Sequence, residues 1–203
     1  WLLFIRFWFG IVCVHGCGAV VMASAREKEV YIKSAGGVFA TVVFYVIGVW
    51  ADPFNIPKGL DFASRAVLFF PWLLCLAIPL FIAIMRVMGY RMFVKNSTDA
   101  QLYSSTETDV NLLALKSQLI NTQEQTLLAL LLYCVWLALA PSENISALCL
   151  SAVAFFVGRL FFFIGYDYNA VLQSLGFVLT FIPQVLLLLH GIIFFVIRPR
   201  LFV

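Results

Sequence analysis

A group of polar side chains enters a long apolar run, where it could bind a ligand or lock helices together. The group lies within Ser117–Gln125, and the apolar run continues from Thr126 to Ala140. Residues three and four apart are neighbours on a helix, so the polar side chains are predicted to share one face. Burying a carboxylate and amides at a membrane edge costs several kcal/mol of free energy unless each group is hydrogen-bonded or paired. The members of the group are Gln118, Asn121, Glu124 and Gln125.

Arg159, inside the next apolar run, is the expected counter-charge of Glu124. Two interpretations of Asn121, Glu124 and Arg159 remain open. They could line a ligand pocket, or they could form a polar clamp that fixes the register of neighbouring helices. A buried ion pair contributes to specificity more readily than to stability, so both roles are compatible with the same residues.

The composition indicates an integral membrane protein. Of 203 residues, 64% are hydrophobic and 11% are charged, and the mean hydropathy is +1.03. Apolar runs of about 20 residues, the length that crosses a bilayer as a helix, occur repeatedly. The pattern predicts an all-α polytopic membrane protein with the lipid bilayer as its first partner. The net charge of +3 lies in the loops and no basic run is interleaved with aromatics, so no nucleic-acid partner is expected.

Six membrane spans are expected, in two groups. Residues 1–65 hold two additional N-terminal spans with their connecting loops, and residues 66–203 form a four-helix domain. Short connections within that domain predict antiparallel neighbours. The expected spans are about 1–24, 35–51, 66–88, 110–140, 145–166 and 170–197.

Local signals refine this plan. Arg26–Lys33 is expected to be a short charged loop, and Pro71 and Pro79 are expected to kink the third span. The first run has neither an initiator methionine nor the profile of a cleavable signal peptide, so we expect further residues before Trp1.

The positive-inside rule gives an orientation. If all six spans cross, the more basic side is expected to face the cytosol. The polar start of the fourth span and Arg159 then lie toward that side. The basic residues on it are Arg26, Lys28, Lys33, Arg86, Arg91, Lys95 and Lys116.

The remaining reactive residue types are interpreted as structural. The five cysteines all lie in apolar runs and lack further ligands at suitable spacing, so no metal site is expected. His190 is interpreted as a satisfied core group, and Tyr166 and Tyr168 as anchors at the membrane surface. Ser174 is interpreted as a helix-interface residue, because no base can be placed beside it.

Three segments together resemble the MAPEG family, the membrane-associated proteins of eicosanoid and glutathione metabolism. The similarity covers about Ala66–Ile197, and the loop from Asp52 to Lys58 resembles the divergent mattrin-like branch in particular. The segments read Ile-Asn-Thr-Gln-Glu-Gln, Gly-Arg-Leu-Phe-Phe-Phe-Ile-Gly-Tyr and Gly-Phe-Val-Leu-Thr-Phe-Ile-Pro.

The resemblance implies a homotrimer of four-helix bundles that binds glutathione between protomers near the cytosolic face. Typical members activate the thiol of glutathione for conjugation, isomerisation or peroxide reduction. Arg159 and Ser174 are catalytic candidates only if the protein is an enzyme, since Ser174 matches a serine beside the thiol in some members. The residues that match the cofactor-binding positions are Asn121, Glu124, Arg159 and Tyr166.

Several family positions are changed. Arginines that stabilise the thiolate correspond to Ile120 and Gln173, another basic position is Ser117, and a tyrosine corresponds to Phe177. Cationic neighbours are what lower the pKa of a thiol, and a hydrogen bond to a charged group contributes about 1.5–3 kcal/mol. We therefore expect the scaffold to be kept and the standard thiolate chemistry to be lost.

Two functions follow as hypotheses. The first is a non-enzymatic or catalytically degenerate protein with a structural, trafficking or assembly role, with other membrane proteins as partners. The endomembrane system (endoplasmic reticulum, Golgi or lysosome-related organelles) is the expected location, with the plasma membrane as the alternative. The second function is a divergent glutathione-dependent transferase, isomerase or peroxidase that acts on a lipophilic substrate, with glutathione as its cofactor.

Overall fold

The computed structural model describes residues 25–57, 59–94, 110–139 and 145–197. Every regular element in these ranges is helical. The elements, in chain order, are α2 (Ala25–Ala51), α3 (Phe62–Phe69), a 3-10 turn (Phe70–Leu73), α4 (Leu74–Gly89), a π-helical turn (Tyr90–Val94), α5 (Val110–Leu139), α6 (Ile145–Tyr168) and α7 (Ala170–Ile197).

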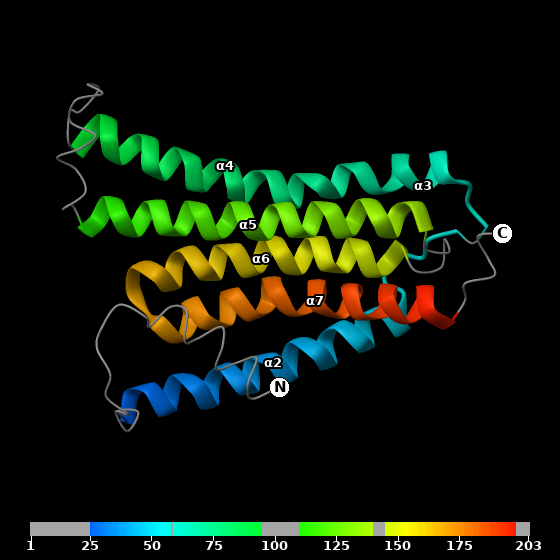
Figure 1. Cartoon of the computed structure of the whole chain (residues 1–203), viewed down its shortest axis with the longest axis horizontal. Helices are drawn as coiled ribbons and strands as arrows, with labels where there is room; N and C mark the ends of the chain where they lie inside the picture. The colour runs from blue at the N-terminus through cyan, green and yellow to red at the C-terminus, as the bar shows by residue number, and fades with distance from the viewer. Residues whose placement is uncertain (1–24, 58, 95–109, 140–144, 198–203) are drawn as a thin grey trace.

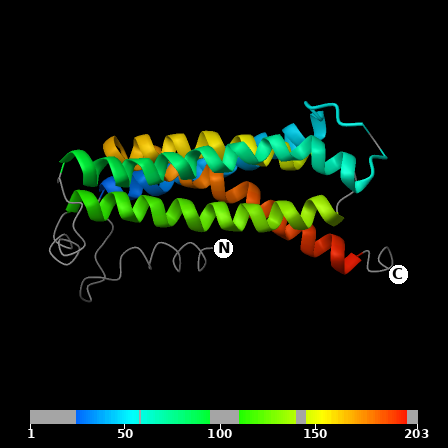
Figure 2. The same cartoon turned by 90° about the horizontal axis from the view of Figure 1, so that it is seen from above.

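The long helices lie side by side; α4, α5, α6 and α7 alternate in direction, whereas α2 runs parallel to its neighbour α7 (Figure 1). α6 is enclosed by its neighbours along most of its length, and its most extensive packing is against α7. Seen from above, α7 crosses the bundle obliquely (Figure 2). One end of the bundle therefore carries the end of α4, the start of α5 and the α6–α7 turn.

Four helices are long and apolar enough to cross a membrane: Phe62–Phe93, Val110–Leu139, Ile145–Tyr168 and Ala170–Ile193. They confirm the last four predicted spans and the multi-pass class. In α2 the apolar part, Ala35–Ile47, is shorter. The first expected span, 1–24, lies outside the described residues, so two additional crossings remain a prediction.

One local prediction is wrong. Arg26–Lys33, expected to be a loop, forms the first turns of α2. Charged residues are good helix formers when no glycine or proline interrupts them, so composition alone could not separate a polar loop from a polar helix start. The polar tracts 95–109 and 141–144 lie outside the described residues.

Of the two prolines expected to kink the third predicted span, Pro71 coincides with a change of helix type. Pro71 lies in the 3-10 turn that separates α3 from α4, whereas Pro79 lies inside α4. Proline removes a backbone donor and clashes with the preceding turn, which accounts for the tighter turn at Phe70–Leu73.

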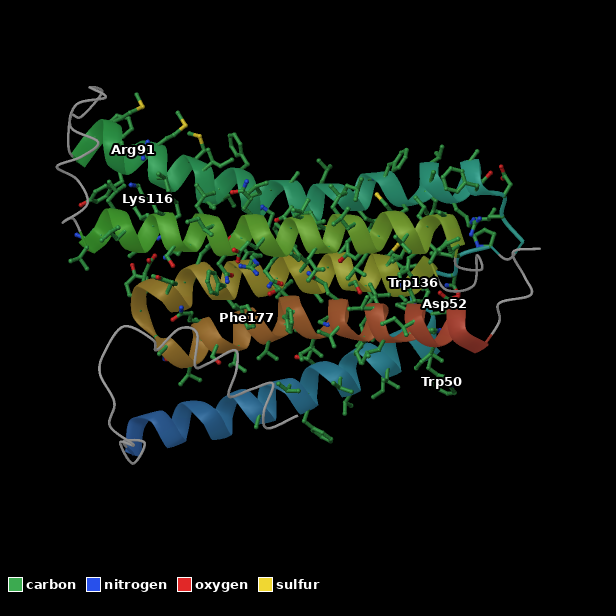
Figure 3. The ribbon with its side chains drawn as sticks, in the orientation of Figure 1. Trp50, Asp52, Arg91, Lys116, Trp136 and Phe177 are labelled. Atoms are coloured by element: carbon green, nitrogen blue, oxygen red, sulfur yellow. The ribbon has the colours of Figure 1, made fainter. Side chains whose placement is uncertain are left out.

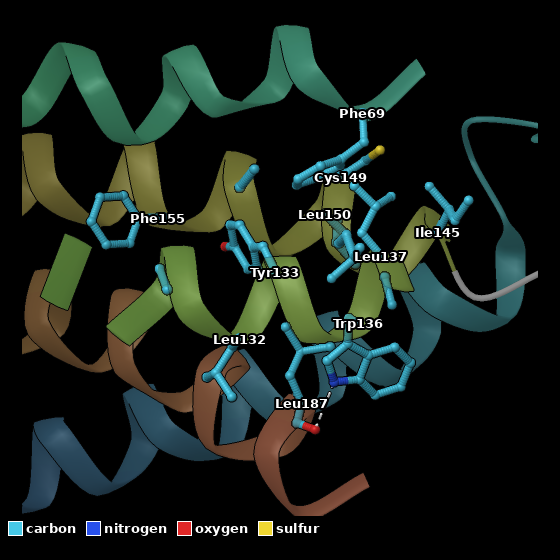
Figure 4. Close-up of a cluster of buried hydrophobic side chains, with 14 of the residues drawn as sticks. Phe69, Leu132, Tyr133, Trp136, Leu137, Ile145, Cys149, Leu150, Phe155 and Leu187 are labelled. Carbon is cyan, nitrogen blue, oxygen red and sulfur yellow. Dashed lines mark hydrogen bonds between the residues drawn. The ribbon is translucent and has the colours of Figure 1, made fainter. Parts of the chain in front are cut away.

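A hydrophobic core fills the end of the bundle opposite the α6–α7 turn (Figure 4). The rings of Phe69 and Tyr133 meet edge to face at 5.6 Å between centroids. Trp136 donates its indole N–H to the carbonyl of Leu187 at 3.0 Å. His190 packs edge-on against Trp136 at 4.9 Å but is exposed, so its interpretation as a core group is wrong.

α2 docks on α7 and α6 through its inner face (Figure 1). Gly37 lets the backbone of α2 approach the side chain of Leu175. Ser151 donates to the hydroxyl of Tyr45 at 3.4 Å, and Ser146, at the start of α6, donates to the carboxylate of Asp52. α2 therefore contacts the four-helix domain both along its middle and at its C-terminal end.

Candidate functional site

Arg159 is the centre of the polar interior. Its side chain is 0% exposed, and it is the largest of the fully buried side chains. A guanidinium inside a membrane-spanning bundle is costly unless its donors are used. The contacts of Arg159 therefore decide what this part of the molecule can do.

The two terminal nitrogens of Arg159 bind α5 and α7. Nη1 donates to Asn121 Oδ1 at 2.9 Å and lies 3.4 Å from Thr122 Oγ1. Nη2 donates to Thr180 Oγ1 at 3.2 Å. One side chain of α6 thus joins three helices through neutral oxygen atoms.

Two aromatic rings enclose the same guanidinium. Its central carbon lies 5.5 Å from the ring centre of Phe155 and 4.9 Å from that of Phe162. Cation–π contact offsets part of the cost of desolvation. The ring of Tyr166 meets that of Phe162 edge to face, with 5.7 Å between the ring centres. Phe162 therefore contacts both Arg159 and Tyr166.

Small residues bring α6 and α7 close enough for these contacts. A Cβ added at Gly158 would lie 2.7 Å from Thr180 Cγ2 and 2.8 Å from the carbonyl oxygen of Gly176. Glycine is required where two backbones approach in this way. The residue directly before Arg159 thereby places Thr180 within reach of the guanidinium.

Glu124 does not join this group. Its side chain is exposed on α5, whereas Asn121 is half-buried. Within the described chain, the hydrogen bonds of Arg159 go to amide and hydroxyl oxygens, so the expected pairing of Arg159 with Glu124 is wrong for a single protomer. Residues three apart on a helix differ by about 60° in direction, which is enough to point one inward and the other outward.

The glutamines of the same stretch point inward. Gln118 is 2% exposed and Gln125 is 4% exposed. The four polar residues of this stretch therefore do not share one environment: two are buried, one is half-buried and one is exposed.

A second polar cluster lies nearer the end of the bundle that carries the α6–α7 turn. Arg86 Nη2 contacts both carboxylate oxygens of Asp167, at 2.8 and 2.6 Å, and Arg86 Nη1 donates to Gln118 Oε1 at 2.7 Å. The Arg86 and Asp167 side chains are 27% and 39% exposed. Sequence reasoning did not predict this pair. Arg91 and Lys116 lie at this end as well (Figure 3).

The model of the MAPEG family matches residues 68–193. The chain belongs to the MAPEG family. No curated protein and no solved structure matched it.

The MAPEG region contains α4 to α7 and hence all of the polar contacts above, while α2 lies before it. Ser174, a catalytic candidate from the sequence, is half-buried on α7. It lies six residues before Thr180, which is about 9 Å along the helix axis. Gln173 and Phe177, singled out in the sequence analysis as changed positions, are also half-buried.

The described residues of this MAPEG protein include no group of three histidine, cysteine, aspartate or glutamate side chains that could hold a metal ion. Cys75, Cys134 and Cys149 are free thiols in the same ranges. Cys13 and Cys17 lie outside the described residues.

Proposed function

We propose that this MAPEG protein is catalytically degenerate and serves a structural, trafficking or assembly role in membranes of the secretory pathway. The observation that carries the proposal is the enclosure of Arg159. Both terminal nitrogens of this cation are engaged inside its own bundle, and none of the side chain is exposed. A guanidinium held in this way acts as an interhelical clamp.

The outer face of α5 supports the same conclusion. Ile120, at a position where the family resemblance implies an arginine, is 55% exposed. An apolar side chain there offers no charge to an anionic peptide or to a thiolate. The described residues therefore fit the thiolate of glutathione poorly, although Asn121 and Glu124 could still hold its polar groups.

Assembly into a homotrimer is part of the proposal. Exposed residues recur on α5 every three or four positions, which is the spacing of a helix–helix seam. Glu124 lies at the middle of this stripe, where lipid would be a costly neighbour, and a second protomer would cover it. The stripe comprises Leu113, Ser117, Ile120, Glu124, Leu127, Leu131 and Val135.

The location, orientation and branch are also proposed. The end of the bundle that holds Arg86, Arg91 and Lys116 would face the cytosol, as the positive-inside rule predicts. The mattrin-like branch is supported by the Asp52–Lys58 loop and by the additional helix α2 before the MAPEG region.

Glutathione binding and turnover test the proposal. The purified chain in lipid nanodiscs would be titrated with glutathione by calorimetry and assayed with an electrophile and a lipid hydroperoxide. We expect no heat of binding and no turnover above protein-free discs. Micromolar binding together with turnover would contradict the proposal.

The second candidate is a glutathione-dependent transferase, isomerase or peroxidase. It is favoured by Asn121 and Glu124, which lie one turn apart on α5 and are half-buried and exposed, respectively. If this function is correct, Glu124→Gln should lower glutathione affinity at least tenfold. Gln123→Ala, a change at an exposed neighbour on the same helix, should leave it unchanged.

A further inference from the structure

The polar interior contains more hydrogen-bonding groups than it uses. Four atoms beside the Arg159 contacts are buried and have no hydrogen-bond partner among the described residues. Buried polar groups in proteins are nearly always satisfied by protein, by water or by a ligand. The four atoms are Arg159 Nε, Gln125 Oε1, Gln184 Nε2 and Gln184 Oε1.

Helix register places these atoms in neighbouring turns of α5, α6 and α7. Gln184 is one turn after Thr180 on α7, and Gln125 is one turn after Asn121 on α5. Thr180 and Asn121 both contact the guanidinium of Arg159. The two glutamines, which are 1% and 4% exposed, therefore lie about one helical turn from these contacts, toward the centre of the bundle.

The charge in this region is unbalanced. Arg159 contacts neutral oxygens within the described chain. Asp167 is engaged by Arg86 and lies eight residues further along α6, about 12 Å away along the axis. Glu124 is exposed on the outer side of α5. A fully enclosed cation with neutral partners attracts an anion more strongly than one in water does.

We infer that the buried side chains of Arg159, Gln125 and Gln184 together bind a small monovalent anion such as chloride or a short carboxylate. Arg159 Nε–H and the amide N–H groups of Gln184 supply donors. The amide of Gln125 can rotate to present its N–H groups, since both ends of a glutamine amide fit the same volume. This site lies inside one protomer and is independent of the proposed protomer seam.

Anion binding should appear as thermal stabilisation. The chain in detergent would be unfolded in increasing chloride, with gluconate replacing chloride at constant ionic strength and acetate as a second small anion. A ligand that binds only the folded state raises its stability in a saturable way. We expect the Tm to rise with chloride or acetate by about 5 °C at saturation. A Tm that is the same in gluconate and in both small anions would overturn the inference.

The Gln184→Leu variant distinguishes anion binding at this buried site from anion binding at the protein surface. Gln184 makes no hydrogen bond among the described residues, so an apolar residue of similar size should leave the Tm in gluconate equal or higher. We expect the variant to lose most of the chloride-dependent rise, while Gln123→Leu, at an exposed position on α5, keeps it. An undiminished rise in Gln184→Leu would overturn the assignment.

Discussion

At the scale of single residues, the contacts of Arg159 separate a glutathione-binding protein from an interhelical clamp. A guanidinium that bound glutathione would need at least one terminal nitrogen free toward a cleft. Here Asn121 and Thr180 occupy the terminal nitrogens, and Phe155 and Phe162 lie against the guanidinium. The side chain that the family resemblance implies for ligand binding therefore joins α5, α6 and α7.

Arg159→Ala should strongly destabilise the bundle. It would leave the oxygens of Asn121 and Thr180 without a donor, at about 1–3 kcal/mol for each buried group left unsatisfied, and would add a cavity. Arg159→Lys should cost less but remain measurable, because one ammonium cannot reproduce the planar fork of a guanidinium. Thermal unfolding in detergent would report both changes. Gln123→Ala is the matched control, and equal Tm values for the three variants would contradict the clamp.

Asp167→Asn should have a small effect. Partly exposed ion pairs contribute about 0–1 kcal/mol, and Gln118 would remain bound to Arg86. We expect a Tm loss well below that of Arg159→Ala, and a smaller loss in high salt because screening already weakens the pair. A loss as large as that of Arg159→Ala would show that the Arg86 cluster, not Arg159, holds the three helices.

At the scale of elements, the packing of α6 against α7 determines the geometry of the interior. Gly158 is one of the points where the two helices approach closely, next to Arg159 in sequence and against Thr180 and Gly176 in space. Any side chain there would push the two helices apart and lengthen the contact between Arg159 and Thr180.

Gly158→Ala should therefore be destabilising although alanine favours helices. The added methyl group would meet the Gly176 carbonyl oxygen at 2.8 Å, and a backbone atom cannot move aside cheaply. Gly36→Ala in α2 is the control, since nothing lies within 4 Å of its Cβ position, and it should stabilise by about 0.5–1 kcal/mol. Opposite shifts in Tm are expected, and stabilisation by both changes would refute the close approach.

The positions of the helices could be predicted from the sequence, but their side-chain contacts could not. Long apolar runs predicted α5, α6 and α7 closely, because bilayer thickness sets their length. The length of the apolar runs could not predict that the Glu124 side chain points outward. Asn121 and Glu124 belong to one broad face of the helix, and only packing decides which of them points inward. The pairing of Arg86 with Asp167 joins residues 81 positions apart, a distance over which local patterns give no information.

At the scale of the whole molecule, the exposed stripe of α5 predicts self-association. A cysteine placed at Leu127, which is 58% exposed, should form disulfide-linked dimers within the trimer when membranes are oxidised in a background without native cysteines. Phe39→Cys, at a 73% exposed position on α2, should not form them, because α2 packs against α6 and α7 on another side of the bundle. Equal cross-linking at both positions would argue against a specific seam at α5.

The most direct test of the whole account is an experimental density map of the chain purified and imaged in saturating glutathione. We predict continuous density from the Arg159 guanidinium to Asn121 and Thr180, with no tripeptide in contact with that side chain. Density for a tripeptide whose carboxylate binds the Arg159 guanidinium, with Asn121 and Thr180 released, would contradict the clamp and restore the glutathione-dependent enzyme.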